Sequence, residues 1–176
     1  MSRLVVISGC SGGGKSSLLA ELARQGHAVV EEPGRRIVRQ ETALGGDALP
    51  WVNPTSFAHR AMTLATADHS AAAASPGWTF FDRSAIDAAS ALQHLTGSPV
   101  LAEIGRLVRY HRTVFLAQPW PELFASDDER RHDMAEAEYH RLEHDYQALG
   151  YDVMFLPRAP IAERAAFVLD TVGTPT

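Results

Sequence analysis

The feature that most constrains the fold is a glycine-rich segment between a short apolar run and an amphipathic stretch. Residues 9–16 read Gly-Cys-Ser-Gly-Gly-Gly-Lys-Ser and match the pattern Gly-x-x-x-x-Gly-Lys-Ser/Thr in full. The unbroken apolar residues 4–7 before it predict a strand covered on both faces. Helical spacing after it predicts a helix that ends near Gly26. Strand, glycine loop and helix in this order indicate a phosphate-binding loop rather than a linker that meets Lys-Ser by chance.

The residue types of this loop suit a triphosphate. Side chains at Gly12, Gly13 and Gly14 would obstruct the close wrapping that lets backbone N–H groups point at phosphate oxygens. The N-terminus of the following helix adds partial positive charge. Lys15 is placed to reach the outer phosphates, and the hydroxyl of Ser16 is placed to ligate Mg²⁺. The predicted nucleotide-binding residues are Gly9, Cys10, Ser11, Gly12, Gly13, Gly14, Lys15, Ser16 and Ser17.

Lysine usage supports a functional role for this loop. The chain has 16 basic residues, and Lys15 is the single lysine among them. Where arginine has replaced lysine nearly everywhere, a surviving lysine suggests that its compact ammonium and flexible stem are needed at that place.

Length and composition predict one domain, residues 1–176, in the cytoplasm. The chain has 176 residues, a net charge of −5 and 45% hydrophobic residues, as in a globular protein with a sizeable core. Basic residues form no cluster, so we expect no nucleic-acid partner. Cys10, the one cysteine, is expected to serve packing rather than redox chemistry. We expect no secretion signal, because the N-terminus lacks a charged region followed by an apolar segment and a small-residue cleavage site. We expect no membrane span, because no apolar run approaches the ~20 residues that a span needs.

Strands alternate with helices along the rest of the chain. Apolar runs predict further strands at residues 28–30, 78–81, 113–117 and 153–156. Helical spacing, caps and prolines predict helices near residues 34–43, 53–74, 85–95, 98–108, 134–149 and 161–168. The prolines and charges of residues 118–133 predict a mobile loop. The alternation favours a parallel sheet with helices on both faces and ligands at the carboxyl ends of the strands, where Gly9, Glu32 and Asp82 fall.

Three further segments resemble motifs of one family. Glu32 stands directly before Pro33 after the second predicted strand, Asp82-Arg83-Ser84 follows the third, and residues 127–132 are highly charged. With the glycine loop, they resemble the P-loop NTPases of the small nucleoside- and nucleotide-kinase-like branch. This branch includes bacterial AAA-type ATPase or kinase-like domains related to ribosylnicotinamide and deoxynucleoside kinases. The resemblance implies a three-layer α/β fold, with a five-stranded parallel sheet of order 2-3-1-4-5 and a lid at about residues 118–133.

The resemblance also implies roles for residues at the strand ends. In deoxynucleoside kinases the glutamate of Glu-Pro acts as base toward the acceptor hydroxyl, and the resemblance gives Glu32 that role. The alternative is that Glu31 and Glu32 are two solvated acids at the surface. Asp82 stands where those kinases have glutamate, and we expect it to support Mg²⁺ through Ser16 or a bound water. Arg83 is expected to fix the acceptor or a phosphate oxygen. A plain Asp-Arg ion pair at the strand end is the alternative.

Other side chains are expected to complete the site. The lid resemblance assigns Arg130, or its neighbour Arg131, to the charge of the transferring phosphoryl group. A solvated loop whose arginines pair with its own acids is the alternative. The spacing Glu32-x-x-Arg35 resembles that of the bacterial ATPase or kinase-like domains, which implies that Arg35 contacts an anionic group. Two aromatic residues, Trp51 and Phe57, follow the region of the second predicted strand. They are expected either to stack on the acceptor or to pack in the core.

Together these inferences predict an enzyme that uses ATP and Mg²⁺ to phosphorylate the hydroxyl of a small, nucleoside-like molecule. The predicted catalytic residues are Lys15, Glu32, Asp82, Arg83 and Arg130, and the predicted metal ligands are Ser16 and Asp82. The base-reading Asn-Lys-x-Asp motif of guanine-specific GTPases needs a second lysine, so its absence argues against a Ras-type switch. A regulatory ATPase switch that a partner protein reads is the alternative, since fold does not fix function. The sequence identifies neither the acceptor nor the choice between monomer and homodimer.

Overall fold

The structure, a computed structural model, describes residues 2–10, 13–119 and 129–175, with the side chains of residues 129–132 outside this description. The elements are β1 (Leu4–Gly9), α1 (Lys15–Arg24), β2 (Ala28–Val30), α2 (Pro33–Leu44), α3 (Pro54–Ala72), β3 (Thr79–Asp82), α4 (Ala85–Thr96), α5 (Val100–Leu107), β4 (Thr113–Ala117), α6 (Glu129–Ala148), β5 (Asp152–Phe155) and α7 (Ile161–Val172). This order confirms the predicted alternation. No helix of the described chain combines the length and apolar character needed to cross a bilayer.

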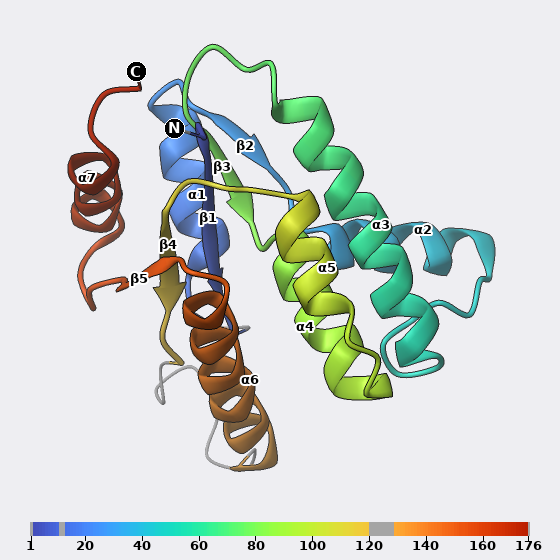
Figure 1. Ribbon diagram of the computed structural model, residues 1–176. Coiled ribbons are helices and arrows are strands. Elements are labelled where there is room, and N and C mark those ends of the chain that lie inside the picture. Colours follow the sequence, from blue (N-terminus) through green and yellow to red (C-terminus); the bar gives the residue numbers. More distant parts are fainter. Residues whose placement is uncertain (1, 11–12, 120–128, 176) are drawn as a thin grey trace.

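The five strands form one parallel sheet in the order β2-β3-β1-β4-β5, as the family resemblance implies. Ile7 of β1 lies opposite Asp82 of β3, and Gly9 lies opposite Ala117 of β4. Because all strands run the same way, their carboxyl ends meet at one edge, the lower edge in Figure 1. The segments that follow β1, β2 and β3 therefore start side by side, in the place where ligands of such sheets bind.

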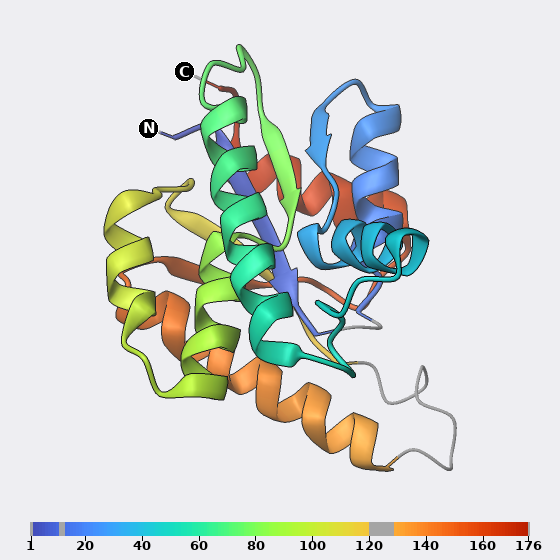
Figure 2. The same ribbon diagram turned by 90° about the vertical axis from the view of Figure 1, so that its right-hand side faces the viewer.

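Helices cover both faces of the sheet and give the molecule three layers (Figure 1). α1 and α7 lie on one face, over a core that includes Val5 and Ile7 of β1. α3, α4, α5 and α6 lie on the other face, over a core that includes Leu4 and Val6. Alternate residues of β1 thus enter two apolar cores, which explains why an unbroken apolar run forms this strand. α2 packs against α3, as Figure 2 shows.

The start of α6 departs from the prediction. The sequence predicts a loop through residues 118–133 and a helix from about Met134, but α6 begins at Glu129. The predicted loop was therefore wrong in residues 129–133, which are helical, and residues 120–128 lie outside the described chain. Acidic side chains are stabilising at a helix N-terminus, and Asp127-Asp128 lead directly into α6. The charges that favour a loop are equally a signal for the start of a helix.

A buried hydrogen-bonded cluster holds α4 against β1 and α6. The carboxylate of Asp87 accepts a hydrogen bond from the Tyr146 hydroxyl at 2.5 Å and one from the Ser84 hydroxyl at 2.9 Å. The hydroxyl of Ser8 on β1 also donates to Asp87. Ser84 and Asp87 form the capping box at the start of α4. Because Ser84 follows Arg83 directly, this cluster fixes the chain at the end of β3.

Tyr146→Phe is expected to lower the free energy of unfolding by about 1–3 kcal/mol, because it leaves a buried carboxylate short of one donor. Tyr146 is fully buried, so water cannot replace its hydroxyl. Urea unfolding of both proteins measures the difference. Tyr139→Phe is the control, since its hydroxyl has a 3.4 Å contact with Gln118. Equal stability of Tyr146→Phe and wild type would contradict the importance of the cluster.

Candidate active site

The loop after β1 leaves no room for side chains at two of its glycines. Gly9 has a φ of +116°, and a Cβ there would clash with the carbonyl oxygen of Ala117 on β4. A Cβ at Gly13 would lie 2.7 Å from the Cβ of Ala117. Ser11 and Gly12 lie outside the described residues. Close contact with β4 therefore requires glycine at positions 9 and 13.

Gly9→Ala is expected to destabilise the protein by about 2–5 kcal/mol, because strain at positive φ adds to the clash with Ala117. Gly77→Ala is the matched control, because no atom lies within 4 Å of a Cβ built at Gly77. Urea unfolding compares the two variants with wild type. Similar stabilities for Gly9→Ala and Gly77→Ala would show that β4 does not confine the loop.

Lys15 is a buried cation in the first turn of α1. Its side chain is only 7% exposed, and Nζ donates hydrogen bonds to the carbonyl oxygens of Gly9 at 3.1 Å and Cys10 at 2.6 Å. Burial lowers the pKa of the ammonium, and the nearby charge of Arg83 lowers it further. Neutral carbonyls offset only part of the cost of burying a charge, so an anion held by this loop would stabilise Lys15.

Ser16 and Asp82 meet between the loop and the end of β3. The Ser16 hydroxyl donates to Oδ2 of Asp82 at 3.4 Å. Asp82 is buried, and its Oδ1 has no hydrogen-bond partner among the described atoms. Burial raises the pKa of Asp82, while Lys15 lowers it. A hydroxyl beside a carboxylate with an unsatisfied oxygen fits Mg²⁺, which prefers oxygen ligands and keeps several waters.

Arg35 joins this group from α2. Its Nη2 donates to the Ser16 hydroxyl at 2.9 Å and lies 3.5 Å from Oε2 of Glu32. The family resemblance implies that Arg35 contacts an anionic group; in the structure Arg35 pairs with the carboxylate of Glu32. Arg35 therefore links the carboxylate at the end of β2 to the hydroxyl at the start of α1.

Arg83 lies in the left-handed region, with a φ of +64°, alone among the described residues other than glycine. Such a backbone costs about 1–3 kcal/mol and persists only where its surroundings hold it. Here Nη1 lies 2.6 Å from Oε1 of Glu138, and Nε lies 3.3 Å from Oε1 of Glu32. Burial alone would lower the pKa of Arg83, but the carboxylates of Glu138 and Glu32 raise it. The guanidinium therefore stays charged between two carboxylates.

Glu138 is a site residue that the sequence reasoning missed. Burial alone would raise its pKa, but the charge of Arg83 holds the pKa of Glu138 below its usual value. It lies on α6, directly before Tyr139, which with Leu142 and Tyr146 forms the buried stripe of that helix. An acidic residue at the border of a buried stripe was the available signal.

Arg164 on α7 is a second site residue that the sequence reasoning missed, and no pattern in the sequence marks it. Its side chain is 2% exposed, and Nη2 donates to the carbonyl oxygen of Gly13 at 2.9 Å. A Cβ at Gly14, which has a φ of +70°, would lie 2.7 Å from Nη1 of Arg164. A guanidinium thus supports the glycine loop from the side of α7.

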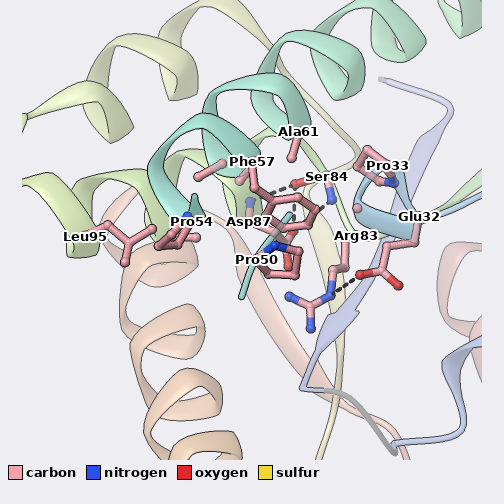
Figure 3. Close-up of a pocket in the computed structure, with 14 residues that line it drawn as sticks. Glu32, Pro33, Pro50, Pro54, Phe57, Ala61, Arg83, Ser84, Asp87 and Leu95 are labelled. Carbon is pink, nitrogen blue, oxygen red and sulfur yellow. Dashed lines mark hydrogen bonds and ion pairs between the residues drawn. The ribbon is translucent and has the colours of Figure 1, made fainter. Parts of the chain in front are cut away.

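Glu32 lines a cavity of about 230 Å³ at the same edge of the sheet. Figure 3 shows its carboxylate beside Arg83, with Ser84 and Asp87 above and the ring of Phe57 across the cavity. Five predicted site residues are therefore brought together from three segments at one edge of the sheet: the start of α1, the end of β2 and the end of β3. They are Lys15, Ser16, Glu32, Asp82 and Arg83.

Other predicted residues are not brought into this group. Glu31 pairs with Arg39 at the surface, and Trp51 is 69% exposed. Phe57, the other predicted aromatic residue, does line the cavity. Cys10 is fully buried and thus suits the predicted packing role, and Ser17 is exposed on α1. The predicted lid arginines, Arg130 and Arg131, lie in the first turn of α6, and their side chains are outside the described structure.

Comparisons with known proteins agree with this architecture. Residues 4–164 match the model of a family described as an AAA domain. A search of curated proteins gives no match.

Similar solved structures show the same fold at low sequence identity. Deoxyadenosine kinase from M. mycoides with bound dATP has 12% identity and a TM-score of 0.62, with 96% of this chain and 98% of that chain covered. Shikimate kinase from Acinetobacter baumannii in complex with shikimate has 13% identity and a TM-score of 0.63, with 98% and 93% covered. NadR protein in complex with NR has 19% identity and a TM-score of 0.67, and this chain spans 50% of its length, with 97% of this chain covered.

Proposed function

Because this chain belongs to the AAA domain family and has the P-loop fold of nucleoside- and nucleotide-kinase-like proteins, we propose that it is an ATP-dependent kinase for the hydroxyl group of a small molecule. The observation that carries this proposal is the position of Glu32, whose carboxylate lines a cavity next to the residues that suit a triphosphate. A hydrolase needs room only for water beside the triphosphate. A cavity with a carboxylate at its inner end suits an organic alcohol instead.

The nucleotide side of the proposal rests on Lys15, Ser16 and Asp82. The backbone of the glycine loop and the ammonium of Lys15 would hold the phosphates of ATP. Ser16 and Asp82 would hold Mg²⁺, which when bound neutralises charge on the phosphate oxygens. Arg35 donates to the Ser16 hydroxyl and would have to release it for metal binding.

The acceptor side rests on Glu32. In the proposed reaction the acceptor oxygen forms a bond to the γ-phosphorus, the bond from this phosphorus to the β–γ bridging oxygen breaks, and ADP leaves. Glu32 accepts the proton of the acceptor hydroxyl. Arg83 holds Glu32 from one side, at 3.3 Å between Nε and Oε1. Arg130 and Arg131 are proposed to add charge from α6.

The neighbours in fold support a small-molecule acceptor. Two of them are kinases, of deoxyadenosine and of shikimate, and the third was solved with NR. All three share the fold at low identity, so the acceptor of this chain has to be found by experiment.

The experiment is a coupled assay of ADP formation with panels of nucleosides and other alcohols. We expect ADP formation to rise at least about tenfold above the ATP-only rate with the right acceptor, because transfer to a positioned hydroxyl outcompetes hydrolysis. ADP formation that no acceptor changes, together with a partner protein retained in one nucleotide state only, would favour the switch instead.

A further inference from the structure

The cavity beside Glu32 is small and largely apolar. Its volume, about 230 Å³, is below the ~300–1,000 Å³ typical of ligand pockets. Phe57, Pro50 and Pro54 form one wall, with Leu95 at the outer end, as Figure 3 shows. A ring in van der Waals contact with the flat faces of Phe57 and the prolines would fill this space. An acceptor with a single ring system suits it better than a long or branched one.

The charged side chains of the cavity gather at its inner end. Among the described residues that line it, these are Glu32, Arg83 and Asp87. Asp87 already accepts hydrogen bonds from Tyr146 and Ser84. The inner end therefore has one positive and two negative charges.

The positive charge of Arg83 is already matched from outside the cavity. Glu138, which does not line the cavity, holds Nη1 at 2.6 Å, while Glu32 contacts Nε from within. The shorter contact is a charge-assisted hydrogen bond, the stronger of the two interactions. An anionic group of an acceptor at this end would meet Glu32 and a guanidinium that is already neutralised, so its desolvation would have no compensation.

We propose that the cavity selects a small ring-shaped alcohol without an anionic group, an inference that rests on the proposed kinase function. Glu138 sets this selection by neutralising Arg83 from outside the cavity. Glu138 is a specificity-determining residue in this account, although it does not touch the acceptor. Removing its charge frees Arg83 to pair with a carboxylate or phosphate on the acceptor.

Binding of matched ligand pairs tests the proposal without any turnover. The first pair is methyl shikimate and shikimate, and the second is adenosine and adenosine 5′-monophosphate; the members of each pair differ chiefly in one anionic group. Isothermal titration calorimetry on the full chain measures the dissociation constant of each ligand. In at least one of the two pairs, the ratio of the anionic member's constant to that of the uncharged member is expected to be about ten or more. In Glu138→Gln this ratio is expected to fall by about tenfold, mainly through tighter binding of the anion.

Two further variants separate charge from structure. Glu138→Asp keeps the carboxylate and is expected to keep the wild-type ratio, and Glu136→Gln removes an exposed charge of the same helix and is also expected to keep it. Tighter binding of the anions to wild type, an unchanged ratio in Glu138→Gln, or no binding of any ligand would overturn the proposal. If the binding preference holds but no acceptor is phosphorylated, the proposed kinase function fails and the selectivity of the cavity stands.

Discussion

Lys15→Met is expected to abolish ATP turnover, with a loss of at least about 10²–10³-fold in kcat, while the free protein stays as stable as wild type. Lys15 is the buried ammonium of the glycine loop, and Gly9 and Cys10 give it only carbonyl partners among the described contacts. A cation so placed contributes most when a polyphosphate lies beside it. Burial lowers its pKa, so the charge is unfavourable in the free protein, and methionine fills the same space without it.

Steady-state kinetics, calorimetry with ATP and Mg²⁺, and urea unfolding together check this prediction. Arg24→Met is the control, because Arg24 ends the same helix, is 73% exposed and pairs with Glu21. It is expected to leave both activity and stability within error of wild type. Full ATP turnover by Lys15→Met would contradict the assignment of the loop. Loss of folding in this variant would instead show that Lys15 is a structural residue.

Glu32→Gln is expected to reduce acceptor phosphorylation by about 10²–10⁴-fold and to leave ATP binding nearly unchanged. The amide has the shape of the carboxylate and still lies beside Arg83 and Arg35, but it cannot accept the proton of the acceptor hydroxyl. A loss in kcat with little change in the KM for ATP is therefore the expected signature.

Glu31→Gln provides the matched control one residue earlier in the chain. Glu31 pairs with Arg39 at the surface and does not line the cavity, so its substitution is expected to leave kcat within about twofold of wild type. Initial rates at saturating ATP with each acceptor measure both variants. Equal rates for Glu32→Gln and wild type would remove Glu32 from the reaction.

Local sequence signals predicted most of the fold because each element carries its own. The unbroken apolar run of β1 reflects burial on both faces, and the Asn53-Pro54 pair sets the start of α3. The start of α6 was predicted about five residues late, because Asp127 and Asp128 suit both a loop and a helix N-terminus. A run of acidic residues that is typical of both a loop and a helix start cannot by itself decide where the helix begins.

The candidate site was predictable only where a motif fixes the chemistry. The loop and the strand ends place Lys15 and Asp82 correctly, since the sheet brings the carboxyl ends of β1 and β3 together. Glu138 and Arg164 come from α6 and α7, and their contacts with Arg83 and the glycine loop depend on how distant helices pack. No spacing in the sequence encodes such contacts, so the structure was needed to find them.

Phosphorus NMR of a reaction mixture distinguishes transfer of the γ-phosphoryl group to an acceptor from its hydrolysis. With ATP, Mg²⁺ and an acceptor that stimulates ADP formation, we expect the γ-phosphoryl group to appear as a new phosphate monoester, in equal amount to the ADP formed. Glu32→Gln is expected to give neither product above background. Release of all the γ-phosphate as inorganic phosphate by the wild-type protein, whatever alcohol is present, would contradict a kinase.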